Sequence, residues 1–273
     1  MNIAITSIQR NRAPWLMEWL AFHLVVGVSR FFMYTHKCDD GSTELLARLS
    51  RNYPITVHPF DAPAQPQLIA YQHAWNTYGA QVDWMAFIDG DEFLFPTTTA
   101  SLIEALAPFV AEPVSALAVF WMCYGSSGHV EDPGGLLLEQ FTRHASLDFS
   151  ANRHVKSIVR GSADPMMVTG SHIFPTLHGT VDTLLRPIDK GHMAELEPSY
   201  KALRINHYVV QCHDFFRLTK QTMGAADAAA DFIRPDTWFA AHDRNECDDG
   251  VRYRFLIAVK LKLREMHACL ADG

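Results

Sequence analysis

The chain has 273 residues, of which 48% are hydrophobic and 19% are charged, a composition typical of a globular domain rather than of a disordered segment. Its 23 Lys and Arg against 30 Asp and Glu give a formal net charge of −7 at pH 7. A chain of this charge lacks the polycationic character of nucleic-acid-binding proteins, and its length suits one large α/β domain.

The first hundred residues alternate between short apolar strands and helices. Strands are predicted at residues 2–8, 30–36, 54–60 and 83–89. Helices are predicted between them at residues 14–27, 39–50 and 66–79. Because strands separated by helices of this length imply right-handed crossovers, we expect a mostly parallel, Rossmann-like central sheet flanked by helices.

After Pro96 this rhythm changes, and residues 125–205 are rich in Gly, His, Pro and Ser. Further strands are predicted at 114–124, 154–160, 165–171 and 203–210, and further helices at 101–110, 214–229 and 250–270. We therefore expect a mixed, loop-rich second half built onto the same α/β sheet.

The predicted closing helix carries five basic residues against one acidic residue, Glu265: Arg252, Arg254, Lys260, Lys262 and Arg264. One interpretation is a helix docked on the core with a solvated basic face. The other is peripheral contact with an anionic membrane surface.

The five cysteines are scattered and form no CxxC pair, which argues against a structural zinc site and a disulfide framework. The segment MNIAITSIQRNR at the N-terminus predicts a strand and its turn, without the apolar stretch of a secretion signal. No run approaches the ~20 apolar residues of a membrane span. We expect a cytoplasmic protein.

The segment WMAFIDGDEFLF, residues 84–95, places Asp89, Asp91 and Glu92 between apolar runs. Asp89 ends the fourth predicted strand, where ligands of open α/β sheets bind, and Gly90 allows the tight turn that turns Asp91 toward the same cleft. Two such carboxylates suit Mn²⁺ or Mg²⁺ with open positions for phosphate oxygens. The alternative is a solvated turn with helix-capping acids.

Two rival motifs fail on their residues. An EF-hand loop starting at Asp89 needs an oxygen ligand and then Gly, where the chain has Phe93 and Leu94. The chain also contains neither a GxxxxGK[ST] loop nor a GxGxxG segment. These absences leave a metal–phosphate site as the chemistry that the acidic segment indicates.

Polar residues near two other predicted strands are further candidates. His207 lies near the end of a late strand, where an imidazole can complete the ligand sphere of a Mn²⁺-like ion or simply pack in the core. Asp39 and Asp40 follow the second strand, where they can accept hydrogen bonds from ribose or a base, or form a turn and helix cap.

Two loops have compositions suited to an acceptor site. Residues 121–135 include His129 and Asp132 in a Gly/Ser-rich loop, which can bind an acceptor or be a long turn. Residues 238–250 place aromatic rings beside Asp243 and Glu246, which suits sugar stacking and hydroxyl contacts as well as a solvated acidic turn.

Seven segments together resemble a known family, in this order: NRAPWLMEWLAFHLVVGVSRFFMY, DDGSTELL, DWMAFIDGDEFLFP, WMCYGSSGH, KSIVR, INHY and RPDTWFAAHDRNE. Their order is similar to that of GT-A glycosyltransferases of the family 2 and family 92 type, in their bacterial branch. The resemblance runs from about residue 3 to residue 257. It implies one GT-A domain over residues 1–273, with a nucleotide-binding half at 1–97 and an acceptor-binding half with the closing helix at 98–273.

The resemblance also implies a nucleotide-sugar donor, usually UDP-linked, a divalent ion held by the DxD motif, and inversion at the anomeric carbon. Carried over by position, Asp89 contacts the donor ribose or sugar and Asp91 binds the metal. Glu92 orients the loop, and His207 resembles the late metal-binding histidine of these enzymes.

The resemblance further matches Thr6, Arg10 and Asp40 to nucleotide-facing positions and suggests that Lys156 reaches the diphosphate. The chain departs from the family pattern at Arg12, where Glu is usual, and at Thr35, where an acidic residue is common. Both departures leave the identity of the donor open.

In such a reaction a carboxylate takes the proton of the acceptor hydroxyl, on the side away from the DxD. The candidates for this base, in order, are Asp243, Glu246 and Asp132, with His129 as a supporting residue of the acceptor loop.

We therefore predict a metal-dependent glycosyltransferase that acts on a glycan or lipid-linked acceptor in polysaccharide assembly, at the inner face of the membrane or free in the cytoplasm. One alternative is a non-catalytic GT-A domain that binds sugar nucleotides or glycans, which would not need to retain Asp89, Asp91 and His207. Another is a nucleotidyltransferase-like metal enzyme, for which the chain lacks a second dense cluster of carboxylates and histidines.

Overall fold

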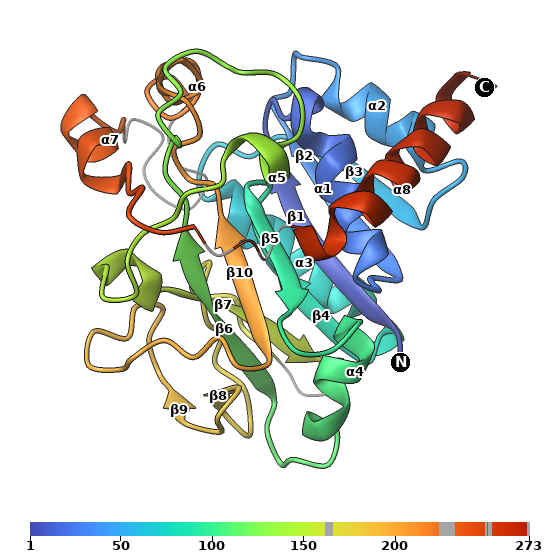
Figure 1. The fold of residues 1–273 in the computed structure, drawn as a ribbon. Helices are drawn as coiled ribbons and strands as arrows, with labels where there is room; N and C mark the ends of the chain where they lie inside the picture. The colour runs from blue at the N-terminus through green and yellow to red at the C-terminus, as the bar shows by residue number, and fades with distance from the viewer. Residues whose placement is uncertain (162–165, 224–232, 249, 251–252, 272–273) are drawn as a thin grey trace.

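A computed structural model of the chain describes residues 1–161, 166–223, 233–248, 250 and 253–271 (Figure 1). Within these ranges the chain builds a ten-stranded mixed sheet in the order β3-β2-β1-β4-β7-β6-β10-β5. Strand β8 branches from β6, and β9 pairs with β8.

The strands are β1 (Ile3–Gln9), β2 (Arg30–His36), β3 (Ile55–Phe60), β4 (Trp84–Phe87), β5 (Glu92–Pro96), β6 (Ala116–Cys123), β7 (Val155–Arg160), β8 (Thr180–Asp182), β9 (Pro187–Ile188) and β10 (Leu203–His207). The helices are α1 (Ala13–Val25), α2 (Ser42–Leu49), α3 (Pro66–Tyr78), α4 (Leu102–Leu106), α5 (Leu137–Gln140), α6 (His213–Leu218), α7 (Asp236–His242) and α8 (Tyr253–Ala271). Short 3₁₀ turns lie at Gly79–Gln81, Ala107–Phe109 and Ser150–Arg153.

Strands β3, β2, β1 and β4 are parallel neighbours joined through α1, α2 and α3, and β6 runs parallel to β10. Strands β7 and β5 are antiparallel to the strands beside them. The predicted α/β class, with a mixed but mostly parallel central sheet flanked by helices, is confirmed.

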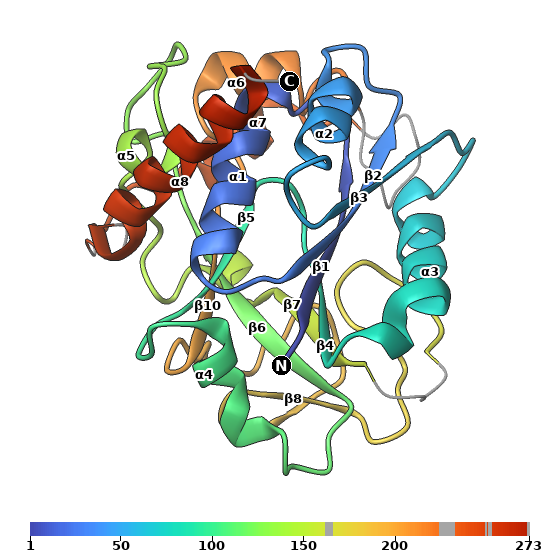
Figure 2. The same ribbon diagram turned by 90° about the vertical axis from the view of Figure 1, so that its right-hand side faces the viewer.

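The helices cover the two faces of the sheet as the alternation of its side chains requires. On β1, Ile3 and Ile5 pack in the cluster that includes residues of α1, α2 and α8, whereas Ala4 packs with Ala70 and Tyr71 of α3. Figure 2 shows α1 and α8 on one side of β1 and α3 on the other. Because successive side chains of a strand point to opposite faces, a strand covered on both faces is apolar throughout. This is why β1 appears in the sequence as a continuous apolar run.

Strand β5, which the sequence analysis did not predict, fixes the acidic segment. It pairs antiparallel with β10 so that His207 lies opposite Glu92. Helix α1 also binds the β5 backbone: Trp19 Nε1 donates to Glu92 O at 2.8 Å, and Leu94 N donates to His23 Nε2 at 3.1 Å. His23 is therefore a neutral imidazole whose Nδ1–H donates to Trp19 O.

Other differences from prediction lie in the second half. Residues 166–171 of the strand predicted at 165–171 are not a strand, and Pro165 lies outside the described residues. The helix predicted at 214–229 is the short α6, with residues 224–229 outside the described part. Helix α7 includes residues 238–242 of the segment 238–250, for which an acceptor site and a solvated acidic turn were both considered. Short helices between loops depend on tertiary contacts rather than on a long apolar period.

Helix α8 packs on the core through Phe255, Val259, Leu263 and Met266. Three of its predicted basic residues have partners. Arg254 donates to carbonyl oxygens of residues 96 and 97, Lys260 pairs with Glu139 and Lys262 pairs with Glu265. Arg252 lies outside the described residues. In the described ranges we find no helix with the length and hydropathy needed to cross a bilayer.

Candidate active site

The acidic segment forms the turn between β4 and β5. Ile88 N still donates to Thr6 O of β1 at 3.3 Å, and Glu92 N closes the turn by donating to Asp89 O at 3.1 Å. A Cβ atom on Gly90 would lie 2.3 Å from Gln9 Oε1, at the end of β1. A larger residue at this position would therefore require the Gln9 side chain to shift, and the turn lies at the carboxyl ends of β1 and β4, as predicted.

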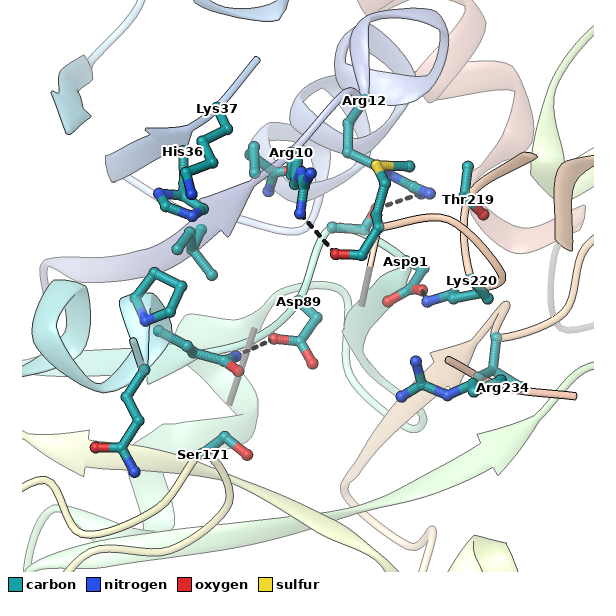
Figure 3. A pocket seen from close by; sticks show the side chains of 18 of the residues that line it. Arg10, Arg12, His36, Lys37, Asp89, Asp91, Ser171, Thr219, Lys220 and Arg234 are labelled. Carbon is teal, nitrogen blue, oxygen red and sulfur yellow. Dashed lines mark hydrogen bonds and ion pairs between the residues drawn. The ribbon is translucent and has the colours of Figure 1, made fainter. Parts of the chain in front are cut away.

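A cavity of about 650 Å³ opens over this turn (Figure 3). Its wall comes from the ends of β1 and β2, residues 62–67, the turn itself, and the segments that contain Ser171, His207 and Lys220. Among the described residues that line it, five are basic, namely Arg10, Arg12, Lys37, Lys220 and Arg234, whereas the carboxylates are Asp89 and Asp91. This excess of positive charge suits an anionic ligand.

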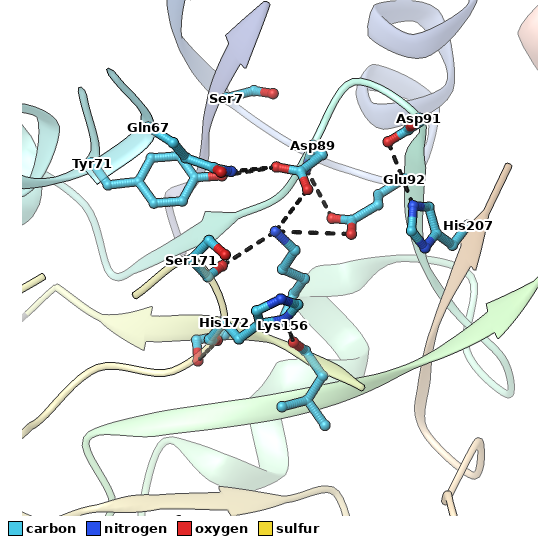
Figure 4. Close-up of polar contacts among 12 residues, drawn as sticks. Ser7, Gln67, Tyr71, Asp89, Asp91, Glu92, Lys156, Ser171, His172 and His207 are labelled. Carbon is cyan, nitrogen blue, oxygen red and sulfur yellow. Dashed lines mark hydrogen bonds and ion pairs between the residues drawn. The ribbon is translucent and has the colours of Figure 1, made fainter. Parts of the chain in front are cut away.

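Asp89 is held by three side chains (Figure 4). Its Oδ1 accepts hydrogen bonds from Gln67 Nε2 at 2.6 Å and Tyr71 OH at 3.2 Å, and its Oδ2 accepts one from Lys156 Nζ at 2.8 Å. Burial opposes ionisation, but Lys156 outweighs it and lowers the pKa of Asp89. The Asp89 side chain is one-third exposed (33%), so an ionised carboxylate faces the cavity in a fixed orientation.

Lys156 lies beneath Asp89 and does not line the cavity, so its position does not support the prediction that it reaches a diphosphate. Its side chain is 1% exposed, and its ammonium also donates to Ser171 O at 3.2 Å and lies 3.9 Å from Glu92 Oε1. Burial lowers the pKa of Lys156, but Asp89 and Glu92 more than offset this and raise it. Lys156 is a buried counter-charge.

Glu92 is fully buried and supports the turn from below. Its Oε2 accepts a hydrogen bond from the backbone N–H of Asp89 at 2.8 Å. Burial, followed by repulsion from Asp89, raises the pKa of Glu92 well above its ordinary value despite the nearby ammonium of Lys156. Its contact with the Asp89 backbone is the one expected of a residue that orients this loop.

Asp91 and His207 face each other although they come from distant parts of the chain. His207 Nε2 lies 3.7 Å from Asp91 Oδ1, and Lys220 Nζ lies 2.7 Å from Asp91 Oδ2. Burial lowers the pKa of His207, while Lys220 and His207 outweigh burial and keep the pKa of Asp91 well below its ordinary value. At neutral pH the pair is a carboxylate beside a neutral imidazole, as metal ligands must be.

The pair fits one divalent ion that takes its other ligands from a substrate. Two ligands about 2.1 Å from a shared ion are themselves roughly 3 to 4 Å apart, as Asp91 Oδ1 and His207 Nε2 are. No cluster of three or more His, Cys, Asp or Glu that could hold an ion occurs in the described part of the chain. An ion held by these two side chains would need further ligands, for which phosphate oxygens and water are suited.

Arg12, noted in the sequence only as a departure from the family pattern, is part of the site. Its guanidinium donates to Gly90 O at 2.9 Å and is sandwiched near the rings of Trp15 and Phe215, at 4.8 and 5.3 Å from their centroids. The feature of the sequence that could have identified Arg12 as a site residue is its position just past the first strand, at the carboxyl edge of the sheet. Lys220 carried no such feature, and Trp121, whose ring lies 4.1 Å from that of His207, was noted only as the first residue of the segment 121–135.

The predicted nucleotide-binding residues are only partly brought together. Arg10 lines the cavity, and its NH1 donates to Met223 O at 2.6 Å. Thr6 is fully buried inside β1 and does not line the cavity. Asp39 exchanges hydrogen bonds with Asn11, at 2.7 and 3.0 Å. Asp40 accepts from the backbone N–H of Ala13 and Ser42, so Asp39 and Asp40 tie a loop to helix ends, which is the alternative role considered for them.

None of the three predicted bases lines the cavity. Asp243 accepts hydrogen bonds from Ser126 N at 2.6 Å and Ser126 Oγ at 3.1 Å, and Glu246 pairs with Arg244. Asp132 accepts from Gly134 N in its own loop. The supporting residue His129 lies 3.2 Å from Gln140 O. These groups are used to hold the loops together, so the assignment of a base to them is not supported by their positions.

The sequence profile of glycosyltransferase family 92 matches residues 3–216. Proteins of that family from Oryza sativa subsp. japonica and Arabidopsis thaliana are 27% and 28% identical to this chain over 79% of its length. The match covers 34% and 36% of those proteins, so the chain spans about a third of the length of these relatives.

Among solved structures, Staphylococcus aureus TarS 1–349 in complex with UDP-GlcNAc aligns with 88% of this chain and 64% of its own, at a TM-score of 0.43 and 11% identity. A similarity this distant does not identify a ligand for this chain.

Proposed function

The chain belongs to glycosyltransferase family 92, and from this membership we propose that it transfers a sugar from a nucleoside-diphosphate sugar to a hydroxyl group of a glycan or lipid-linked saccharide. The observation that carries the proposal is the cavity: an ionised Asp-Gly-Asp turn at the carboxyl end of β4 lies within a wall of basic side chains. A donor with a diphosphate and a hydroxyl-rich sugar matches both kinds of group.

The basic side chains supply what the leaving group needs. Arg10, Arg12, Lys220 and Arg234 line the cavity around the turn, and a leaving diphosphate gains negative charge as the bond to the sugar breaks. Guanidinium groups bind phosphate oxygens in pairs, and their positions are set before the reaction starts. Lys37 is assigned no role here, because its ammonium lies 3.6 Å from Asp61.

Asp89 is proposed to accept a hydrogen bond from a hydroxyl of the donor. Gln67, Tyr71 and Lys156 fix both of its oxygens, so the carboxylate keeps one orientation without a ligand. Preorganisation of this kind lowers the entropy cost of binding and favours one position of the sugar. That the donor is UDP-linked is proposed from the family resemblance.

We propose that Asp91 and His207 hold a divalent ion, Mn²⁺ or Mg²⁺. When bound, the ion would neutralise charge on the leaving diphosphate. Residues of the chain prepare the position: the ring of Trp121 packs on His207, and the backbone N–H of Tyr208 donates to Asp91 O at 2.9 Å. Both ligands are thus oriented by neighbouring groups.

Inversion at the anomeric carbon is proposed from the resemblance alone. Inversion requires a base on the acceptor side. In the described ranges the carboxylates that line the cavity are Asp89 and Asp91, and each is paired with a lysine, so neither is assigned as this base. The alternative of a domain that binds a sugar nucleotide without turnover shares the same cavity. It differs in releasing no nucleoside diphosphate.

The test is a thermal-shift titration of the full chain with UDP-, GDP- and dTDP-linked sugars, with and without Mn²⁺. We expect one donor to raise the melting temperature in a Mn²⁺-dependent way and Asp91→Asn to lose the effect. Glu246→Gln, which removes a carboxylate away from the cavity, should respond like the unaltered chain. Absence of any response to diphosphate nucleotides would rule the proposal out. Release of nucleoside diphosphate from the stabilising donor then separates an enzyme from a binding domain.

We also propose that the protein is cytoplasmic and touches the inner face of a membrane through α8. Tyr253, Ile257 and Leu261 lie one turn apart on α8 and are 64%, 75% and 53% exposed. The helical period puts this stripe opposite Phe255 and Val259, which pack on the core. An apolar stripe beside basic residues suits the interface of an anionic bilayer.

A further inference from the structure

Lys220 lies against the carboxylate that is proposed as a metal ligand (Figure 3). Its Nζ is 2.7 Å from Asp91 Oδ2, while His207 faces Oδ1 of the same carboxylate. The side chains of Asp91 and Lys220 are 7% and 21% exposed, so solvent screens their attraction only weakly. The ammonium thus occupies one of the two oxygens through which Asp91 can bind an ion.

The position of Lys220 is fixed by the fold. Phe215 of α6 packs edge-on against Trp15 of α1, with ring centroids 4.9 Å apart. Thr219 donates its backbone N–H and its hydroxyl to Phe215 O, at 3.0 and 2.7 Å. Lys220 is the next residue, so its backbone is anchored to the end of α6. Arg12 links α6 to the Asp-Gly-Asp turn, because its guanidinium lies over the ring of Phe215 and donates to Gly90 O.

The charges around Asp91 make it hard for a metal ion to bind alone. Asp91 is already neutralised by Lys220, and the Arg12 guanidinium lies on the backbone of Gly90 next to it. A divalent ion arriving by itself must displace the ammonium or remain close to it, and like charges this close repel strongly. A diphosphate removes the conflict, because it offers the displaced ammonium new oxygen partners.

We propose that Lys220 is a competing cation, which neutralises Asp91 in the empty site and transfers to the diphosphate when metal and nucleotide bind together. The proposal rests on the proposed function, because it takes a divalent ion and a nucleoside diphosphate as the ligands. It makes the binding of the two cooperative, and the coupling acts equally in both directions. Lys220 therefore weakens the binding of metal alone and strengthens the binding of diphosphate.

The experiment measures Mn²⁺ binding without nucleotide, by electron paramagnetic resonance of the free ion, and UDP binding with Mn²⁺ present, by calorimetry. In Lys220→Gln we expect Mn²⁺ to bind about tenfold more tightly than in the unaltered chain, and UDP about tenfold more weakly. Lys220→Arg keeps the charge and should shift neither affinity by as much. The matched control is Lys37→Gln, because Lys37 lines the same cavity but pairs with Asp61; its Mn²⁺ affinity should be unchanged.

Opposite changes in the two affinities distinguish competition from a structural role, in which both would fall together. If Asp91→Asn abolishes Mn²⁺ binding but Lys220→Gln leaves it unchanged or weaker, the role of Lys220 is overturned while the proposed metal site stands. If Mn²⁺ binds to none of these proteins although a nucleotide sugar does, both the metal site and the role of Lys220 are overturned, and the donor site stands.

Discussion

The imidazole of His207 lies 3.7 Å from the carboxylate of Asp91, across the boundary between β10 and the turn before β5. The antiparallel register of β5 and β10 is the cause, because it places His207 directly opposite Glu92. Side chains at such a pair of positions are held by the backbone hydrogen bonds of the ladder and need no ligand to bring them together.

This relationship predicts that Asp91 and His207 act as a unit in binding metal. We expect Asp91→Asn and His207→Gln each to weaken Mn²⁺ binding at least about tenfold, or about 1.4 kcal/mol, since each removes one of two protein ligands. Because they act on one ion, the double variant should lose little more than either alone. Isothermal calorimetry on the four proteins measures this; additive losses in the double variant would contradict a shared ion.

Lys156 is predicted to be essential for stability. Lys156→Met leaves Asp89 and Glu92 beside each other without their buried cation, at an expected cost of about 3 kcal/mol or more. Urea denaturation at pH 7 measures the loss. Lys37→Met, at a half-exposed lysine, is the comparison and should stay within about 0.5 kcal/mol of the unaltered chain. Equal effects of the two substitutions would show that Lys156 is not a buried counter-charge.

Glu18 of α1 predicts a pH dependence of stability. It is buried and accepts hydrogen bonds from Leu137 N at 2.7 Å and Leu138 N at 3.0 Å, and burial raises its pKa to about 7. A raised folded-state pKa means that the folded chain holds the proton more tightly than the unfolded chain. Its contribution is complete below about pH 4.5 and is lost as the pH rises through 7, a change of about 3 kcal/mol.

Glu18→Gln stays neutral and should flatten this part of the stability profile between pH 4.5 and 7. The free energy of unfolding from urea titrations at several pH values checks it. Glu44→Gln, at an exposed position of α2, serves as control and should leave the profile unchanged. Parallel profiles for Glu18→Gln and the unaltered chain would mean that Glu18 is not responsible.

The apolar stripe of α8 predicts binding to anionic vesicles. The chain should sediment with vesicles rich in phosphatidylglycerol but not with phosphatidylcholine alone, and Ile257→Ser with Leu261→Ser should reduce binding several-fold. Folding should be unaffected because both side chains are more than half exposed. Leu218→Ser, at a residue 73% exposed on α6, controls for loss of any surface apolar group. A stripe that instead mediates self-association would show as a change in oligomeric state with no vesicle binding.

The sequence by itself determined the first four strands, the helices between them and the position of the acidic turn, since each depends on a local pattern. Apolar runs such as Ile3–Gln9 and Trp84–Phe87 are buried on both faces, and the parallel order follows from the helices that join them. The approach of His207 to Asp91 was one of two hypotheses drawn from its place near a strand end and was also implied by the resemblance, and the pairing of β5 with β10 explains it.

Only the tertiary structure decided which polar groups face the cavity. Asp243, Glu246 and Asp132 have the chemistry of a base, but Asp243 accepts hydrogen bonds from Ser126 of a distant loop, and Glu246 and Asp132 are bound by neighbours in their own loops. Lys156 was predicted to reach a diphosphate but is buried under Asp89, whereas Lys220, which the sequence analysis did not single out, reaches Asp91 from just after α6. Local periodicity sets the elements, whereas the contacts of a charged side chain depend on how distant loops pack, which no local pattern encodes.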